Sequence, residues 1–371
     1  MVGQLAYDRD YALNAVCPYF TMFPLEFPMR ILRKHKADDP IVLDPFCGRG
    51  TTIFAARALE IEAYGMDTSP VACAIARAKL VSTSVDKVIA LANEFIARAP
   101  RDVPDSPFFT TAYAPSTLRE LCSLREGLLR MPYDTDESVM LRAAALGCLH
   151  GPRSRSKSRA GYFSNQMPRT FASKPDYSVR YWRRHRLRPP KLSTAAVLTR
   201  KLTRIGTLDK SAAGPFHNVG CADAREKASF RRAAKPSIII TSPPYYGMQT
   251  YVQDQWLRNW FLGGPSEIEY ENDFQLNHNG KQQFITDLAK VWKNCWDWSD
   301  RVAHLYIRFG TIPSVKSDAR EILKASLEEA GGWKLVSTRR ADTASAGKRQ
   351  ADQMAGGSEA AEEFDFHAVS Y

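Results

Sequence analysis

Residues 40–67 read PIVLDPFCGRGTTIFAARALEIEAYGMD. The run PIVLD (40–44) is short, apolar and rich in β-branched residues, and the glycine-containing turn after it opens the helical pattern TTIFAARALE (51–60). AYGMD (63–67) then predicts a second strand, and VACAIARAKL (71–80) predicts a second helix. Strand, helix, strand and helix in this order indicate parallel strands joined by right-handed crossovers.

Strand signals are lost after about residue 99 and return near residue 216. SIIITS (237–242) is apolar through its centre, as expected of a central strand buried on both faces. Further strand candidates are AHLYIRF (303–309), WKLVST (333–338) and FDFHAVSY (364–371). We therefore expect an α/β fold with a mostly parallel sheet. Residues 1–100 and 216–371 would form it around an inserted, basic, helical region at 101–215.

The composition is that of an ordinary globular protein, with 44% hydrophobic and 25% charged residues among 371. No run of 18 apolar residues predicts a membrane helix, and the N-terminus MVGQLAYDRDYAL lacks the pattern of a signal peptide. The seven cysteines show neither metal-ligand spacing nor a disulfide pattern. We expect a cytoplasmic, nucleoid-associated protein with reduced thiols, no metal and no membrane contact.

The positive charge is concentrated in the insertion. The whole chain has a net charge of +11, whereas residues 151–205 hold fifteen Lys or Arg and one acid, Asp176, a net +14. Aromatic residues interleave with these cations, which suits phosphates and unstacked bases. The alternative is a solvated or disordered basic segment, a description that fits SRSKS (154–158). The candidate DNA-binding residues are Arg153, Arg155, Lys157, Arg159, Tyr181, Trp182, Arg183, Arg184, Arg186 and Arg188.

The turn DPFCGRGTT (44–52) has the features of a cofactor loop. Gly48 and Gly50 allow a sharp turn and a close approach to a ligand, and the helix N-terminus favours an anionic group. Asp67 follows Gly48 by 19 residues, a spacing suited to the hydroxyls of a ribose. Ile53 replaces the third glycine of the dinucleotide pattern, which disfavours NAD and FAD. S-adenosylmethionine, with a ribose, an amino-acid end and no pyrophosphate, fits better.

The run TSPPYYG (241–247) follows the apolar strand and has the features of a catalytic loop. Its two prolines force Ser242 and Pro243 into extended geometry, which fixes the direction of the Pro243 carbonyl. An exocyclic amino nitrogen shares its lone pair with its ring, so two acceptors that hold its hydrogens would free that pair. The Ser242 hydroxyl and the Pro243 carbonyl can be these acceptors, and Tyr245 can stack on the base. The alternative is a rigid turn that ends the strand.

These motifs resemble those of the amino-methyltransferases of bacterial restriction–modification systems. DPFCGRGT resembles their motif I and TSPPY their motif IV. The likeness extends to motif II in GMD (65–67), motif III in CADAR (221–225), motif X in YFTMFP (19–24) and a late loop in GKRQADQM (347–354). It covers about residues 1–100 and 216–371. It implies the Rossmann-like class I methyltransferase fold, with a mostly parallel, seven-stranded sheet, and S-adenosylmethionine as cofactor.

The resemblance also implies roles for individual residues. Motif X would pack around the methionine end of the cofactor, and Asp223 would face its adenine ring. The cofactor-binding set is Tyr19, Phe20, Thr21, Asp44, Phe46, Gly48, Gly50, Thr51, Asp67, Thr68 and Asp223. The catalytic set is Ser242, Pro243, Pro244 and Tyr245.

Motif IV with serine first is the form associated with N4-cytosine enzymes, whereas aspartate or asparagine there is usual for N6-adenine enzymes. We therefore expect N4 methylation of a flipped cytosine in double-stranded DNA. N6-adenine methylation, methylation of an RNA amino group, and a non-catalytic nucleic-acid-binding protein on this scaffold stay open. The chain ends soon after the last expected strand, so the insertion is the candidate for target recognition. Any restriction endonuclease partner would be a separate chain.

Overall fold

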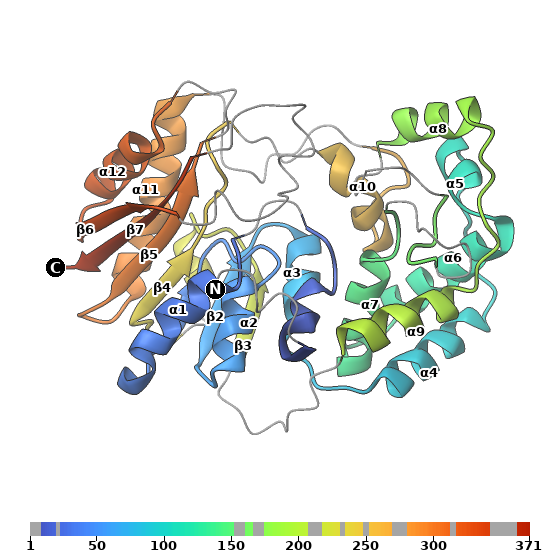
Figure 1. The fold of residues 1–371 in the computed structure, drawn as a ribbon, viewed down its shortest axis with the longest axis horizontal. Helices are drawn as coiled ribbons and strands as arrows, with labels where there is room; N and C mark the ends of the chain where they lie inside the picture. Colours follow the sequence, from blue (N-terminus) through green and yellow to red (C-terminus); the bar gives the residue numbers. More distant parts are fainter. Residues whose placement is uncertain are drawn as a thin grey trace.

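The computed structural model describes residues 9–19, 23–151, 160–165, 174–206, 217–230, 234–247, 252–268, 280–311, 317–341 and 362–371. Within these ranges seven strands form one sheet in the order β3-β2-β1-β4-β5-β7-β6 (Figure 1). The strands are β1 (Val42–Asp44), β2 (Ala63–Asp67), β3 (His217–Cys221), β4 (Ile238–Thr241), β5 (His304–Gly310), β6 (Trp333–Arg340) and β7 (Glu363–Ser370). All pairings from β3 to β5 are parallel, and β7 runs antiparallel to β5 and β6. This confirms the expected mostly parallel, Rossmann-like sheet.

The strand order reverses between β1 and β4. From β1 the chain moves outward to β2 and β3, then returns to the other side of β1 and continues through β4 to β5. In open α/β sheets, ligands bind outside the carboxyl ends of the strands at such a switch point. The sheet therefore places a binding site where β1 and β4 end.

Side chains alternate between the two faces of the central strands, and both faces are buried. Ile238 and Ile240 belong to one hydrophobic core, whereas Ile239 between them belongs to the other. The first core includes side chains of α1 (Glu26–His35), α2 (Thr51–Ala58) and α3 (Pro70–Arg77). The second includes side chains of α11 (Lys281–Trp298) and α12 (Ala319–Ala330). Burial on both faces of the sheet explains why β4 is apolar without interruption.

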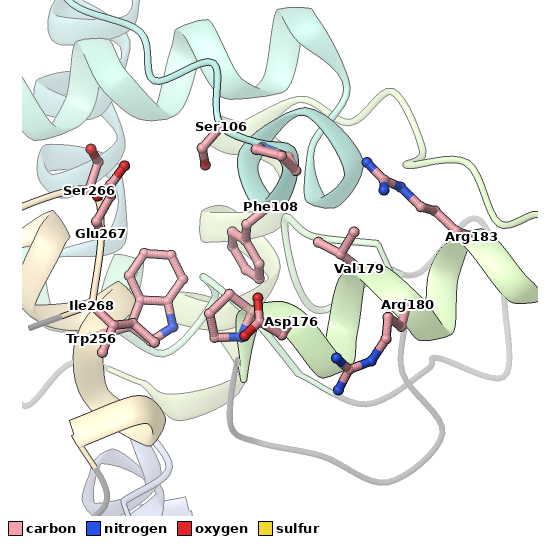
Figure 2. A pocket seen from close by; sticks show the side chains of 12 residues that line it. Ser106, Phe108, Asp176, Val179, Arg180, Arg183, Trp256, Ser266, Glu267 and Ile268 are labelled. Atoms are coloured by element: carbon pink, nitrogen blue, oxygen red, sulfur yellow. The ribbon is translucent and has the colours of Figure 1, made fainter. Parts of the chain in front are cut away.

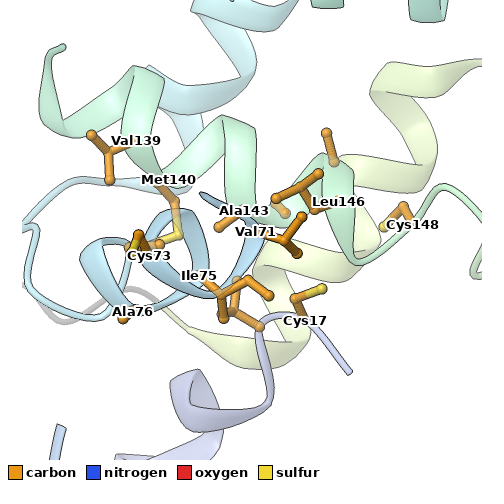
Figure 3. Packing of buried hydrophobic residues seen from close by; sticks show 14 of the residues in the cluster. Cys17, Val71, Cys73, Ile75, Ala76, Val139, Met140, Ala143, Leu146 and Cys148 are labelled. Atoms are coloured by element: carbon orange, nitrogen blue, oxygen red, sulfur yellow. The ribbon is translucent and has the colours of Figure 1, made fainter. Parts of the chain in front are cut away.

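A group of helices lies beside the sheet and shares the first hydrophobic core (Figure 1). They are α4 (Val85–Ile96), α5 (Pro107–Ala112), α6 (Pro115–Leu129), α7 (Asp136–Leu146), α8 (Pro175–Arg184), α9 (Thr194–Ile205) and α10 (Val252–Phe261). Short 3-10 helices span Arg9–Ala15, Lys36–Asp38 and Lys227–Phe230. Figure 3 shows Met140 and Ala143 of α7 near Val71 and Ile75 of α3, so this packing joins the helical group to the sheet layer.

Local signals in the sequence fix where these helices begin. Thr135 caps α7, because its hydroxyl accepts from the Ser138 amide while the Ser138 hydroxyl accepts from the Thr135 amide. Ser69 caps α3 by accepting from the Ala72 amide, and Pro70 follows at the first helical position. The α3 cap matters for the site, since it sets the direction of the chain that leaves Asp67.

The six strands and two helices predicted by residue range are confirmed to within about three residues at each end. The inserted region is helical in its described part, as expected. β3 was not among the predicted strands. The boundary at residue 100 stays a prediction, and α4, which precedes it, packs against α6, α7 and α9. None of the helices in the described ranges has both the length and the apolar composition of a membrane span.

Candidate active site

Three neighbouring strands end at, or immediately before, residues that the sequence assigned to the site. β2 ends at Asp67, β1 at Asp44 and β4 at Thr241, immediately before Ser242. The order β2-β1-β4 therefore brings the predicted cofactor loop and the predicted catalytic loop to adjacent strand ends. A direct hydrogen bond joins them, since the Thr241 hydroxyl donates to Asp44 Oδ1 at 2.6 Å.

The loop after β1 is a tight turn fixed by backbone hydrogen bonds. The Cys47 amide donates to the Met66 carbonyl at 2.9 Å, and the Gly50 amide donates to the Cys47 carbonyl at 2.7 Å. Gly48 has φ +49° and Gly50 has φ +76°, conformations that favour glycine. A Cβ at Gly50 would also lie 2.7 Å from the Ala76 Cβ, whereas one at Gly48 would meet no atom within 4 Å. Gly50 thus lets α3 pack closely, and Gly48 leaves open space in front of the loop.

Asp67 holds this loop to the end of β2. Its Oδ2 accepts from the Gly48 amide at 2.9 Å, and its Oδ1 accepts from the Ser69 amide at 2.8 Å. Each carboxylate oxygen has a further lone pair, so both can still accept from the hydroxyls of a ribose. Desolvation raises the pKa of Asp67, opposed by the two amide donors. The carboxylate is therefore a structural anchor as well as the predicted ribose ligand.

Asp44 lies fully buried between the two loops. Besides Thr241, the Phe46 amide donates to its Oδ1 at 3.2 Å, whereas its Oδ2 is buried and has no hydrogen-bond partner. Burial raises the pKa of Asp44 to about 7. A buried acceptor without a donor is costly, and a ligand that brings an N–H group would remove that cost.

The arrangement fits S-adenosylmethionine. Asp44 Oδ2 offers an acceptor to an ammonium group, Asp67 offers acceptors to a ribose, and the space before Gly48 is open. Thr51 is buried and begins α2 directly after Gly50, so the partial positive charge of the helix N-terminus lies at the loop. Phe46 is half-buried, with its ring edge to face against Trp292 at 6.2 Å. Thr68 follows Asp67 and is half-buried.

The predicted motif X residue Tyr19 lies beside this site. Burial, together with the neighbouring Asp67 carboxylate, raises the pKa of its hydroxyl, and the Ser69 side chain lies close enough to act in the opposite direction. Six predicted site residues lie outside the described part of the chain: Phe20, Thr21, Arg153, Arg155, Lys157 and Arg159. The late loop at 347–354 lies outside it too.

Asp223 follows β3 and is engaged by an arginine that the sequence did not single out. Arg225 donates to both carboxylate oxygens, at 2.7 Å from Nη2 to Oδ2 and 3.1 Å from Nε to Oδ1. The same guanidinium reaches Asp287 of α11 at 3.1 Å. This pairing lowers the pKa of Asp223 against its partial desolvation, and its role toward adenine stays a prediction. The signal in the sequence that could have indicated this pairing was the position of an arginine two residues after the acid in CADAR.

The loop Ser242–Tyr245 leaves β4 with Pro243 buried and the other three residues half-buried. The Tyr245 ring packs edge to face on Phe309 of β5 at 5.7 Å. Burial and the nearby Glu363 carboxylate raise the pKa of the Tyr245 hydroxyl, which also lies within reach of Ser242. Glu363 begins β7, far along the chain, and no sequence pattern pointed to it.

The predicted arginine cluster lies on the outer side of α8 and in the turn after it. Arg183, Arg184, Arg186 and Arg188 are all exposed. Tyr181 is half-buried and stacks on His185, with ring centroids 4.1 Å apart. These four guanidinium groups are thus open to a polyanion.

Trp182 was predicted to contact DNA, and this prediction is wrong. Its side chain is 0% exposed and packs against Phe108 and His150, with ring centroids 5.7 Å and 6.0 Å away. Together with Ser178 and Val179 it forms the buried side of α8. A ring in this position anchors the helix and cannot stack on a base.

A pocket of about 470 Å³ lies between α5, α8 and the chain after α10. Figure 2 shows the Phe108 and Trp256 side chains in the middle of the pocket. Arg180 and Arg183 of α8 lie on one side of them, and Glu267 lies on the other. The lining thus combines two arginines, two acids (Asp176 and Glu267) and two aromatic rings, and it includes one arginine of the exposed cluster. No group of three or more potential metal ligands was found among the residues that the structure describes.

Comparison with known proteins finds a match in the N-terminal part of the chain, which contains the predicted cofactor loop. Residues 7–78 match the DNA methylase family of N6- and N4-methyltransferases. The chain is also similar to the Type II methyltransferase M.MjaII of Methanocaldococcus jannaschii, with 31% identity over 81 residues. That alignment covers 22% of this chain, and the chain spans only about 15% of the length of that relative.

Solved structures show weaker likeness. The rRNA methyltransferase AviRa from Streptomyces viridochromogenes is 13% identical, with a TM-score of 0.34, and 99% of this chain and 90% of that chain are covered. Magnesium protoporphyrin IX methyltransferase (ChlM) from Synechocystis PCC 6803, with bound S-adenosylmethionine, is 9% identical, with a TM-score of 0.31 and coverage of 100% and 99%. The segment 7–78, which holds the cofactor loop and Asp67, is thus similar to the DNA methylase family.

Proposed function

We propose that the chain is an S-adenosylmethionine-dependent DNA methyltransferase that methylates the exocyclic N4 of cytosine. The observation that carries this proposal is the 2.6 Å hydrogen bond from Thr241 to Asp44. It joins the end of β4, where the Ser-Pro-Pro-Tyr loop begins, to the end of β1, where the cofactor loop begins. A base held by the first loop would therefore lie beside a cofactor held by the second.

The chemistry requires little beyond positioning. S-adenosylmethionine supplies a methyl group on a sulfonium centre. The Ser242 hydroxyl and the Pro243 carbonyl accept the two hydrogens of the amino group, which directs the nitrogen lone pair toward the methyl carbon. The amino nitrogen forms the new N–C bond as the C–S bond breaks, and it releases one proton to water. Holding the two reactants in line converts an improbable encounter into a unimolecular step.

The residues assigned to the cofactor divide by the part that they would hold. Asp67 binds the ribose, Asp44 Oδ2 receives the ammonium group, and Tyr19 with the rest of motif X surrounds the methionine end. Asp223 lies at the adenine end. The support is local: Asp44, Asp67 and Asp223 follow or end neighbouring strands of the sheet, and a Cβ at Gly48 would meet no atom within 4 Å.

DNA is the proposed substrate for two reasons. The matched family is one of DNA methylases, and the exposed cluster Arg183, Arg184, Arg186 and Arg188 offers four cations to phosphates. The target base would leave the duplex to reach Ser242, at a cost of a few kcal/mol. Cytosine is preferred over adenine because of the serine at the start of motif IV, which is a family association. A restriction endonuclease, where one exists, would be a separate partner.

Mass spectrometry of digested DNA tests the proposal. We expect N4-methylcytosine in DNA from a methylation-free host that expresses the chain, and none with the Ser242→Ala variant. N6-methyladenine would overturn the choice of base and keep the mechanism. C5-methylcytosine would overturn the mechanism too, because that reaction needs an attacking nucleophile, and this motif has none. Modification of RNA alone would favour the RNA amino-methyltransferase.

A further inference from the structure

Arg49 lies between the two glycines of the cofactor loop and is unusual for a buried arginine. Its side chain is only 7% exposed, and its Nε–H has no hydrogen-bond partner. Within the described ranges, no carboxylate lies at ion-pair distance from its guanidinium. Burial lowers its pKa to about 10, and it still carries its charge at neutral pH. A buried, charged donor without an acceptor is costly unless a ligand completes it.

The surroundings of Arg49 are positive. Cys17 lies beside it, and the buried cations Lys79 and Lys201 are close enough to interact with it electrostatically. Those two lysines are hydrogen-bonded, Lys79 to the Asn14 side chain at 2.7 Å and Lys201 to the Ala15 carbonyl at 3.0 Å. Both partners are neutral, so neither offsets the positive charge. Arg49 is thus the member of this group with a donor still free.

The loop around Arg49 also limits what the missing partner can be. The N-terminus of α2 follows directly and adds partial positive charge toward the same space. Asp44, at the start of the loop, has the opposite deficiency, a buried oxygen without a donor. A ligand that carries both a carboxylate and an ammonium group would satisfy both positions. A DNA phosphate would satisfy Arg49 and leave Asp44 without a donor. It would also have to reach a side chain that is only 7% exposed.

We propose that Arg49 binds the α-carboxylate of the methionine end of S-adenosylmethionine. This inference rests on the proposed function, because it names a specificity contact in the same site. The arginine binds the amino-acid end of the cofactor, while Asp67, at the end of β2, binds its ribose. The enzyme thereby distinguishes its cofactor from relatives that have the nucleoside and the sulfur but lack the carboxylate.

Equilibrium binding tests this without catalysis. Calorimetry would compare S-adenosylmethionine with decarboxylated S-adenosylmethionine, which keeps the sulfonium and the amine. We expect the wild type to prefer the first by about 10- to 100-fold, the range of a charged hydrogen bond. Arg49→Met should lose most of that preference while it binds the decarboxylated compound as the wild type does. Arg49→Lys should fall between them, because lysine keeps the charge and loses the planar fork.

The matched control is Arg57→Met. Arg57 lies on α2, and its guanidinium donates to the Lys79 carbonyl, to the Val81 carbonyl at 3.2 Å and to the Ser82 hydroxyl at 3.0 Å, so these hydrogen bonds hold the chain after α3 and none is made to the cofactor loop. The Arg57→Met variant should prefer S-adenosylmethionine over the decarboxylated compound by the same factor as the wild type. An unchanged preference in Arg49→Met would overturn the proposal. Equal binding of both compounds by the wild type would also overturn it, and that measurement does not depend on the folding of any variant. Failure of the wild type to bind either compound would refute the proposed function instead.

Discussion

Asp44 ends the central strand and connects both halves of the site through a single carboxylate oxygen. One of its oxygens accepts from Thr241 and Phe46, and the other is buried without a hydrogen-bond partner. The sequence placed Asp44 in a cofactor loop, but only the strand order shows that it also holds the catalytic loop. Similarly, Asp67 anchors the loop through Gly48 and Ser69 before any ligand binds.

The raised pKa of Asp44, about 7, predicts how stability depends on pH. A carboxyl whose folded pKa lies above its unfolded value near 4 binds its proton more tightly in the folded state. Its contribution is therefore complete below about pH 4 and is lost as the pH rises toward 7. Between pH 4 and 7, we expect the unfolding free energy of the wild type to fall by on the order of 1–3 kcal/mol relative to Asp44→Asn.

Urea unfolding of both proteins at several pH values would measure this difference. Parallel pH profiles would show that Asp44 titrates normally. The experiment is more informative when repeated with saturating S-adenosylmethionine. A cationic group at Oδ2 would lower the pKa of Asp44, so the pH dependence should shrink when the cofactor is bound.

Asp67→Ala removes the predicted ribose ligand together with the anchor of the loop. We expect S-adenosylmethionine affinity to fall about 10- to 100-fold, because two charge-assisted contacts are lost. Asp67→Asn can still accept from one amide, so it should bind more tightly than the alanine variant. Calorimetry on folded protein, verified by circular dichroism, is the measurement. Wild-type affinity in both variants would remove Asp67 from the cofactor site.

Ser242→Ala and Tyr245→Ala should separate catalysis from cofactor binding. Ser242 would hold the amino group and Tyr245 the base, so both variants should lose turnover by at least about 100-fold while S-adenosylmethionine affinity stays within about twofold. Tyr245→Phe keeps the ring and loses the hydroxyl near Glu363, and it should retain more activity than alanine if stacking is the role. Near-normal methylation by both alanine variants would remove this loop from the active site.

At the scale of elements, the strands could be predicted because each is a short apolar run between turn residues. β3 could not, because its sequence HNVGC contains a single large apolar residue, Val219. Trp182 was misread for a related reason. Its basic neighbours suggested stacking on bases, but Val179 lies three residues earlier on the same side of α8 and indicated a buried face. Contacts such as Tyr245 with Glu363 join distant segments and leave no local pattern.

The packing of α2 against α3 predicts different costs at the two loop glycines. Gly50→Ala would place a Cβ 2.7 Å from the Ala76 Cβ at positive φ, whereas Gly48→Ala has the positive φ without the clash. We expect a loss of about 2–4 kcal/mol for the first and about 1 kcal/mol for the second. Ala76→Gly should recover part of the first loss. Equal losses by denaturant unfolding would show that α3 does not pack on the loop.

For the whole molecule, the sheet and the helical group meet at one hydrophobic core, so the proposed recognition surface has a fixed position relative to the catalytic edge. The sequence localised the positive charge to 151–205 but could not say which cations are exposed. The structure divides them: Lys201 is buried and donates to the Ala15 carbonyl, while Arg183, Arg184, Arg186 and Arg188 are open to solvent. Charge counting alone could not separate these roles.

The exposed cluster makes a prediction about DNA binding as a function of salt. If each of the four arginines contacts a phosphate, the quadruple alanine variant should bind cognate and scrambled duplexes more weakly by similar factors. Each lost contact should reduce the slope of log affinity against log salt by about one, so the total reduction should approach about four. If one of them reads a guanine instead, its single alanine variant should lose about 1–3 kcal/mol of discrimination at one position of the site.

A matched control removes the same number of positive charges from residues far from α8 in the sequence. Arg33, Lys34 and Lys36 lie exposed in α1 and directly after it, and Arg301 is exposed before β5, at the amino edge of that strand. Neutralising these four changes the net charge equally, so any effect common to both quadruple variants reflects the overall field of the protein. The difference between them measures local contact. Binding titrations over a salt series give both slopes. If the α8 variant keeps the affinity and salt slope of the control on both duplexes, the cluster is a solvated surface, and DNA must bind elsewhere on the carboxyl edge.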